Sequence, residues 1–164
     1  MDLLWSPWRY DYIKGSEQET PADFNGCVFC HLINSPAPDE DKFILKRAGH
    51  NFVILNIYPY VSGHLMVVPY EHLADLDSAP KHVSDELMDL AKECQSALRD
   101  AYSPNGFNLG MNLGKAAGAG VAEHFHLHIL PRWIGDANFM TSIGQTRTIP
   151  ESLEMTYRKL KTRF

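Results

Sequence analysis

The ten residues at 123–132, EHFHLHILPR, limit the fold more than any other part of the chain. Histidines occupy every second position, namely His124, His126 and His128. The positions between and after them are apolar, namely Phe125, Leu127 and Ile129. Successive side chains of a β-strand point to opposite faces, whereas a helix would scatter these residues around its axis. We therefore expect a strand with one apolar face and one face of imidazoles, which Pro131 ends because it has no N–H for a ladder bond.

The composition is that of one globular domain. The chain has 164 residues, of which 45% are apolar and 21% charged, enough for a core of its own. Its net charge of −5 argues against nonspecific nucleic-acid binding, which usually needs a basic face. We find no signal peptide and no apolar run of the ~20 residues that a membrane span needs. The expectation is a cytoplasmic enzyme with neither nucleic acid nor membrane as partner.

Three cysteines raise the question of metal or redox chemistry. Cys27 and Cys30 form a CxxC motif, whereas Cys94 stands alone on the apolar stripe of a predicted helix. Without an export signal, metal binding or redox exchange is favoured over a structural disulfide. The redox interpretation requires a strand before the motif, and nothing there indicates one. Cys94 is expected to be a small core residue.

Hydrophobic patterns predict five strands and three helices. Besides the histidine stretch, strands are expected at 43–45, 52–57, 64–69 and 107–112. The second and third of these would form an antiparallel hairpin. A long helix is expected from Ser84, its N-cap, to Ala101, and a short one that begins at His31 and ends before Pro36. A C-terminal helix over 150–164 would begin at Pro150 and run for about 13 residues.

The chain is expected to be a single domain, 1–164, that starts with an arm and loop at 1–25. A glycine-rich loop, LGKAAGAG at 113–120, precedes the histidine stretch. It is either a flexible hairpin loop or a cradle in which backbone N–H groups bind phosphate. It matches neither of the glycine motifs typical of nucleotide-binding loops.

The residues alone leave three interpretations of the histidine face. Alternate histidines can bind a catalytic metal ion with an open position for water. Alternatively, one histidine is a nucleophile that attacks phosphorus, flanked by neighbours that bind phosphate. The third interpretation, a purely structural polar face, is disfavoured by the strict alternation and by the preceding glycine loop.

The sequence around these histidines resembles the histidine triad (HIT) superfamily, whose motif is HφHφHφφ with φ an apolar residue. The stretch from His124 to Leu130 fits it, and Leu55-Asn56-Ile57 followed by Gly63-His64 is similar to the first nucleotide-contacting hairpin of the superfamily. Within the superfamily the chain most resembles the bacterial diadenosine tetraphosphate phosphorylases. That likeness rests on LWSPWR at 4–9, GVAEH at 120–124, PRW at 131–133 and GDANF at 135–139.

This resemblance implies a fold and a reaction. The fold is of the α+β class, with a five-stranded antiparallel sheet and a long packed helix, and it usually pairs as a two-fold homodimer. His126 would attack the α-phosphate of diadenosine tetraphosphate and hold AMP as a covalent histidyl-AMP. Inorganic phosphate would then release ADP, after ATP has left. His128 and His64 would lie against the phosphates.

The same resemblance assigns the substrate contacts and a cofactor. Asn56 would bind the ribose hydroxyls, and Phe29 and Leu32 would sandwich the base. The phosphate contacts would be Asn112, Gly118, Ala119 and Gly120. Trp133 would stack near a second nucleotide, across the dimer. Superfamily members with a CxxC motif bind a structural zinc, whose ligands here match Cys27, Cys30, His72 and His124.

The chain departs from the superfamily pattern at one point. Many dinucleotide hydrolases of the superfamily carry a glutamine a few residues before the motif, where this chain has Gly118 to Val121. The departure disfavours a plain hydrolase and leaves the acid for the leaving group unassigned, with His128 as one candidate. The alternatives are a dinucleoside polyphosphate hydrolase, a nucleoside phosphoramidase, a catalytic zinc hydrolase and a non-catalytic nucleotide-binding regulatory module.

Overall fold

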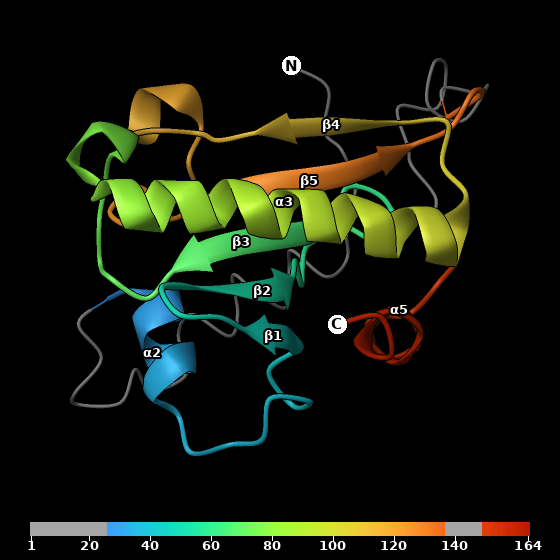
Figure 1. Ribbon diagram of the computed structural model, residues 1–164, viewed down its shortest axis with the longest axis horizontal. Coiled ribbons are helices and arrows are strands. Elements are labelled where there is room, and N and C mark those ends of the chain that lie inside the picture. Colours follow the sequence, from blue (N-terminus) through green and yellow to red (C-terminus); the bar gives the residue numbers. More distant parts are fainter. Residues whose placement is uncertain (1–25, 137–148) are drawn as a thin grey trace.

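A five-stranded antiparallel sheet forms the centre of the computed structural model, which describes residues 26–136 and 149–164 (Figure 1). The strands are β1 (Ile44–Arg47), β2 (Asn51–Leu55), β3 (Leu65–Pro69), β4 (Gly106–Gly110) and β5 (Leu127–Arg132). Their order across the sheet is β1-β2-β3-β5-β4, which makes β5 an inner strand. The predicted α+β class and the hairpin of β2 and β3 are confirmed. The N-terminal arm at 1–25 lies outside the described residues.

Helices cover the sheet. They are α2 (Val28–Asn34), α3 (Lys81–Tyr102) and α5 (Leu153–Lys161), and there are two 3₁₀ turns, η1 (Leu76–Ser78) and η2 (Lys115–Ala117). The long helix α3 lies across one face of the sheet, and α5 packs against α3 and β1 (Figure 1). Among the described residues, none of the helices has the length and apolarity that crossing a membrane requires.

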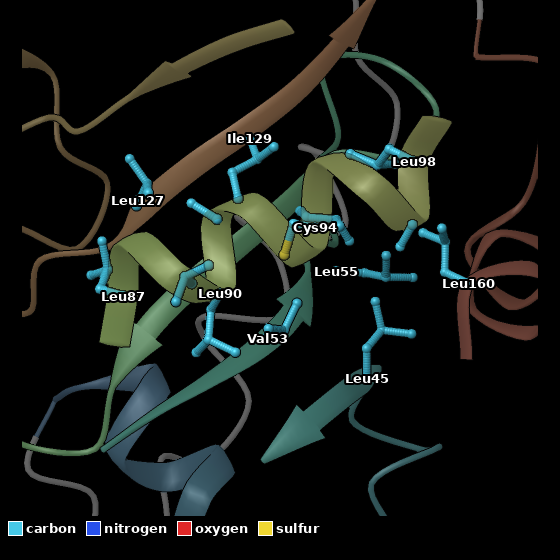
Figure 2. Close-up of a cluster of buried hydrophobic side chains, with 14 of the residues drawn as sticks. Leu45, Val53, Leu55, Leu87, Leu90, Cys94, Leu98, Leu127, Ile129 and Leu160 are labelled. Carbon is cyan, nitrogen blue, oxygen red and sulfur yellow. The ribbon is translucent and has the colours of Figure 1, made fainter. Parts of the chain in front are cut away.

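Side-chain alternation divides the core into two clusters. Val53 and Leu55 of β2 belong to the first cluster, which α3 covers and in which Cys94 is fully buried (Figure 2). Phe52 and Ile54 of the same strand belong to the second cluster, together with Phe29 of α2. The apolar residues between and after the histidines all belong to the first cluster, namely Phe125, Leu127 and Ile129. The predicted apolar face of the histidine stretch is thus confirmed, and so is the core position of Cys94.

The strand predicted for the histidine stretch begins later than expected, and only His128 of the three histidines lies in it. β5 starts at Leu127, so His124 and His126 lie in the segment that leads into it. Val67 faces Leu127, and Pro69 would face Phe125 if the pairing continued. Pro69 has no N–H to donate, so the ladder stops. The N–H of Phe125 instead donates to a carbonyl of the segment after β3, at 2.7 Å.

The other end of β5 also differs from the prediction. Pro131 does not end the strand but lies inside it, opposite Phe107 of β4. β3 pairs with β5 only as far as Ile129, so Pro131 has a neighbouring strand on one side only. A residue without an N–H is tolerated at such an edge position.

Both longer helices start at residues other than those the periodicity predicts. α3 begins at Lys81, one turn before Ser84, because the carbonyl of Pro80 already accepts the N–H groups of residues 83 and 84. α5 begins after Ser152, whose hydroxyl oxygen accepts a backbone N–H of the first turn. Pro150 therefore lies outside α5, which has 9 residues rather than about 13.

Candidate active site and metal centre

Four metal-binding side chains converge where β3 ends and the histidine segment begins. Cys27 precedes α2, Cys30 lies in its first turn, His72 follows β3 and His124 precedes β5. One ligand atom from each lies within 4.8 Å of the others. Cys27 and His124 are buried, and His72 is exposed. The structure therefore brings together all four ligands that the resemblance implies.

The distances among these atoms fit one tetrahedral ion. Sγ of Cys27 lies 3.2 Å from Nδ1 of His124, and Sγ of Cys30 lies 3.2 Å from Nδ1 of His72. Sulfur and nitrogen ligands of a tetrahedral zinc, with Zn–S about 2.3 Å and Zn–N about 2.0 Å, lie about 3.5 Å apart. Nε2 of His124 donates to the carbonyl oxygen of Pro69 at 2.9 Å, which leaves Nδ1 unprotonated and directed at the sulfurs.

The protonation of this cluster also fits a bound cation. Burial and the neighbouring Cys27 raise the pKa of the Cys30 thiol to about 11, so a thiolate there is costly without a positive charge. A divalent cation between the sulfurs reverses this cost and holds them as thiolates. Burial lowers the pKa of His124 to about 4, which keeps it a neutral ligand. Two thiolates and two imidazoles form a closed set that suits a structural zinc.

His126 has one ring nitrogen engaged and the other available. Nδ1 lies 3.1 Å from the carbonyl oxygen of His124, so its N–H donates there. Burial lowers the pKa of His126, and the ring is neutral near pH 7 with its single proton on Nδ1. Nε2 has no hydrogen-bond partner among the described residues. A neutral imidazole with an unengaged Nε2 lone pair is a nucleophile for phosphorus.

His64 and His128 form a buried pair whose tautomers are fixed by a backbone amide. The N–H of Tyr60 donates to Nδ1 of His64 at 3.2 Å, so the proton of a neutral His64 is on Nε2. That Nε2 lies 2.9 Å from Nδ1 of His128 and donates to it. The proton of His128 is therefore on its own Nε2, where it can donate to an anion. Its ring centroid is 4.7 Å from that of His126.

The burial of His64 predicts how stability depends on pH. Burial, with His128 and His126 nearby, lowers the pKa of His64 to about 3. Between pH ~6.5 and ~3 the unfolded chain therefore binds a proton that the folded chain does not. We expect the free energy of unfolding to fall, through this group, by about 1.4 kcal/mol per pH unit as the pH decreases through this window.

Denaturant unfolding between pH 7 and pH 5 measures this dependence. Zinc release at low pH acts on the wild type and on His64→Asn alike, so the difference between their slopes isolates His64. The His64→Asn variant should show a shallower loss of stability towards low pH. Parallel curves for the two proteins would contradict the assignment.

The residues expected at the base and ribose lie close to the histidines. The Phe29 ring is 4% exposed and lies against the rings of His124 and His126, with centroids 5.4 and 5.0 Å away. Leu32 is half-buried on the same helix. Asn56 follows β2, and its Oδ1 accepts the N–H of Tyr58 at 2.9 Å. Its Nδ2 is 3.4 Å from both ring nitrogens of His64.

The glycine loop folds partly on itself. η2 lies inside it, and Gly118 ends this turn in the left-handed region at φ +85°. The N–H of Gly118 donates to Lys115 at 3.0 Å, and that of Ala119 reaches the Gly114 carbonyl at 3.4 Å. An anion that binds the Ala119 amide therefore competes with only a long hydrogen bond. Asn112 precedes the turn and is half-buried, and Gly120 is exposed.

Two further aromatic residues differ in how they lie relative to the histidines. Trp133 follows β5, and its Nε1 donates to the carbonyl of Tyr102 at 3.3 Å. It lies five positions after His128, about 16 Å along an extended chain, so it does not join the histidines of its own chain. Tyr60 was not predicted, yet its amide orients His64 and its exposed ring lies 4.8 Å from that of His64. Its position in a Pro- and Gly-containing turn gives no sequence signal for this role.

Comparison with known families and sequences gives consistent results. The profile of the HIT domain family matches residues 37–133. The chain is 38% identical over 165 residues to an AP-4-A phosphorylase of Mycobacterium tuberculosis (strain H37Rv), an alignment that covers 100% of this chain and 85% of the relative. It is 30% identical to the adenosine 5'-monophosphoramidase of Saccharomyces cerevisiae, over 74% of this chain and 72% of that protein.

A solved structure gives the same result for the fold. A Zn-bound histidine triad family protein from Mycobacterium smegmatis superposes with a TM-score of 0.69 and 30% sequence identity. The superposition covers 84% of this chain and 92% of that protein.

Proposed function

The chain belongs to the HIT domain family, and on this basis we propose that it catalyses the phosphorolysis of diadenosine tetraphosphate to ADP and ATP through a covalent histidyl-AMP. The 38% identity to an AP-4-A phosphorylase along the whole chain supports this substrate. The observation that carries the mechanism is the state of His126, which is neutral, protonated on Nδ1 and unengaged at Nε2.

The first step transfers the nucleotidyl group to the enzyme. The Nε2 lone pair of His126 attacks the α-phosphorus, a P–N bond forms, and the bond from phosphorus to the bridging oxygen of the β-phosphate breaks. ATP leaves with that electron pair. The His126 ring becomes positively charged as the bond forms. The carbonyl oxygen of His124 stabilises this charge through its hydrogen bond from the N–H at Nδ1. The Nε2 proton of His128 is placed to donate to the negative phosphate oxygens.

In the second step His126 is the leaving group, and inorganic phosphate accepts the AMP group. An oxygen of inorganic phosphate attacks the same phosphorus, the P–N bond breaks, and ADP leaves while His126 recovers its lone pair. Asn112 and the backbone at Gly118, Ala119 and Gly120 are proposed to bind the phosphates. Asn56 is proposed to bind the ribose, and Phe29 and Leu32 the base.

Cys27, Cys30, His72 and His124 would hold a structural zinc, which would tie α2 to the segment that carries the nucleophile. We further propose that the protein is a cytoplasmic homodimer. Trp133, which lies away from the histidines of its own chain, would then contact a second nucleotide from the partner subunit. The exposed β4, at one edge of the sheet, is a surface that such pairing could use.

Product analysis with and without inorganic phosphate tests the acceptor. With phosphate we expect equal amounts of ADP and ATP from diadenosine tetraphosphate, at a rate that rises with phosphate concentration. Without phosphate, turnover should stop after one equivalent of ATP per active site, because AMP stays on His126. Formation of ATP and AMP independent of phosphate would refute the phosphorylase assignment in favour of a hydrolase.

A nucleoside phosphoramidase is the second candidate, supported by the 30% identity to the yeast enzyme. It would use the same nucleophile but release an amine in the first step. Comparing the turnover of adenosine 5'-phosphoramidate with that of the tetraphosphate, at equal enzyme concentration, separates the two candidates.

A further inference from the structure

Helix α2 carries a buried ring between the metal centre and the nucleophile. Cys27 and Cys30 fix the first turn of this seven-residue helix, and Phe29 is its one buried residue. The position of the Phe29 side chain is therefore set by the two cysteines on either side of it. Only 4% of the residue is exposed, so little of its surface is available to a base.

The ring of Phe29 touches the nucleophile itself. Its centroid is 5.0 Å from that of His126 with the planes at 56°, and 5.4 Å from that of His124 at 71°. Both geometries lie in the range of favourable tilted and edge contacts between aromatic rings. The remainder of the side chain packs in the second core cluster, which leaves the ring little room to move.

Two restraints thus act on the His126 ring. The carbonyl oxygen of His124 accepts a hydrogen bond from the N–H at Nδ1 of His126, which fixes which ring nitrogen carries the proton. Phe29 blocks one side of the ring and so limits its rotation about the bond to Cβ. Both restraints begin at metal ligands, since His124 is one and Phe29 lies between two others. Neither requires substrate to be bound.

We infer that Phe29 is a positioning residue, which transmits the fixed position of the metal-bound helix to His126 and holds its Nε2 towards the substrate phosphorus. This role rests on the proposed nucleotidyl transfer and goes beyond a contact with the base. A misplaced nucleophile lowers the rate of bond formation without weakening substrate binding. A lost base contact has the opposite signature.

Phe29→Leu and Leu32→Ala, in the zinc-loaded full chain, form a matched pair on one helix. We expect Phe29→Leu to lower the rate of histidyl-AMP formation at saturating substrate by about 10-fold or more, an effect larger than any change in KM that its loss from the base site causes. Leu32→Ala should raise KM and leave that rate near the wild-type value. Zinc content, measured by elemental analysis, should equal that of the wild type in both variants.

Nitrogen-15 NMR of the histidine rings, without substrate, gives a readout independent of turnover. The wild-type His126 should show a protonated Nδ1 and an unprotonated Nε2, identified by loss of these signals in His126→Asn. In Phe29→Leu the two signals should move towards an average of both tautomers, whereas in Leu32→Ala they should stay in place. If Phe29→Leu loses zinc, Phe29→Met takes its place, because the flexible methionine side chain fills irregular gaps in a core.

Unmoved His126 signals, together with a change in KM alone, would overturn the inference and leave Phe29 as a wall of the base site. Failure of the proposed function looks different. In that case the wild type forms no histidyl-AMP from the tetraphosphate, while the ring signals still report whether Phe29 orients His126.

Discussion

Replacing His126 with alanine is expected to lower turnover by at least about 10³-fold, because the covalent step loses its nucleophile. The metal ligands and both core clusters keep their members in this variant, so the fold should persist. The reaction of the enzyme with labelled diadenosine tetraphosphate is quenched in alkaline denaturant, because the P–N bond of histidyl-AMP is labile in acid, and mass spectrometry should then detect AMP on the wild-type protein and none on His126→Ala.

His82→Ala is the matched control for this experiment. His82 is exposed in the first turn of α3 and belongs neither to the metal centre nor to the buried histidine pair. Its replacement should leave both turnover and labelling as in the wild type. Labelling of His126→Ala at another histidine, or turnover within tenfold of the wild type, would contradict the assignment of the nucleophile.

Loss of the zinc site is expected to cost more stability than any other single change considered for this protein. In Cys27→Ala the cluster keeps three ligands, and Cys30 loses the cation that its thiolate form requires. Losing a bound metal is among the few mechanisms that destabilise by more than about 4 kcal/mol. We expect the melting temperature to fall by about 10 °C and the zinc content to fall towards zero.

Cys94→Ala separates the metal from the loss of a buried thiol. Cys94 is a fully buried residue of α3, away from the metal centre, so its replacement should cost only about 1 kcal/mol and leave one zinc per chain. Chelation of the zinc should unfold the wild-type protein. In a catalytic zinc hydrolase, chelation would instead stop the chemistry and leave the fold intact. Freshly purified, reduced wild type without zinc, or a metal-loaded Cys27→Ala of unchanged melting temperature, would contradict the structural zinc.

The local pattern of the histidine segment predicts its faces correctly, because alternation depends only on neighbouring residues. Phe125, Leu127 and Ile129 lie in one cluster as expected. The limits of β5 are not predictable in this way. They are set by Pro69 on the neighbouring strand and by the length of the pairing with β3, which depend on residues far away in the sequence. The same holds for α3, whose start is set by the backbone carbonyl of Pro80.

The candidate site likewise contains some groups that the sequence predicts and others that it does not. A CxxC motif and a resemblance suffice to name Cys27, Cys30, His72 and His124, and the structure brings these four together. The groups that fix the protonation of the histidines are backbone atoms: the carbonyls of Pro69 and His124 and the amide of Tyr60. Every residue but proline offers both groups, so no side-chain pattern marks them. Only the folded chain identifies which of them are used.

The hydrogen-bonded chain from Tyr60 through His64 to His128 starts at a backbone amide, which cannot supply a proton to the two histidines. If His128 gave its Nε2 proton to a leaving group, it would draw a replacement from His64, which in turn could take none from an amide that keeps its own. The pair can therefore solvate negative charge but cannot shuttle protons, which argues against His128 as a leaving-group acid. The site therefore favours a group that departs as a stable anion, as a nucleoside polyphosphate does, and disfavours the amine of a phosphoramidate, which needs a proton to leave.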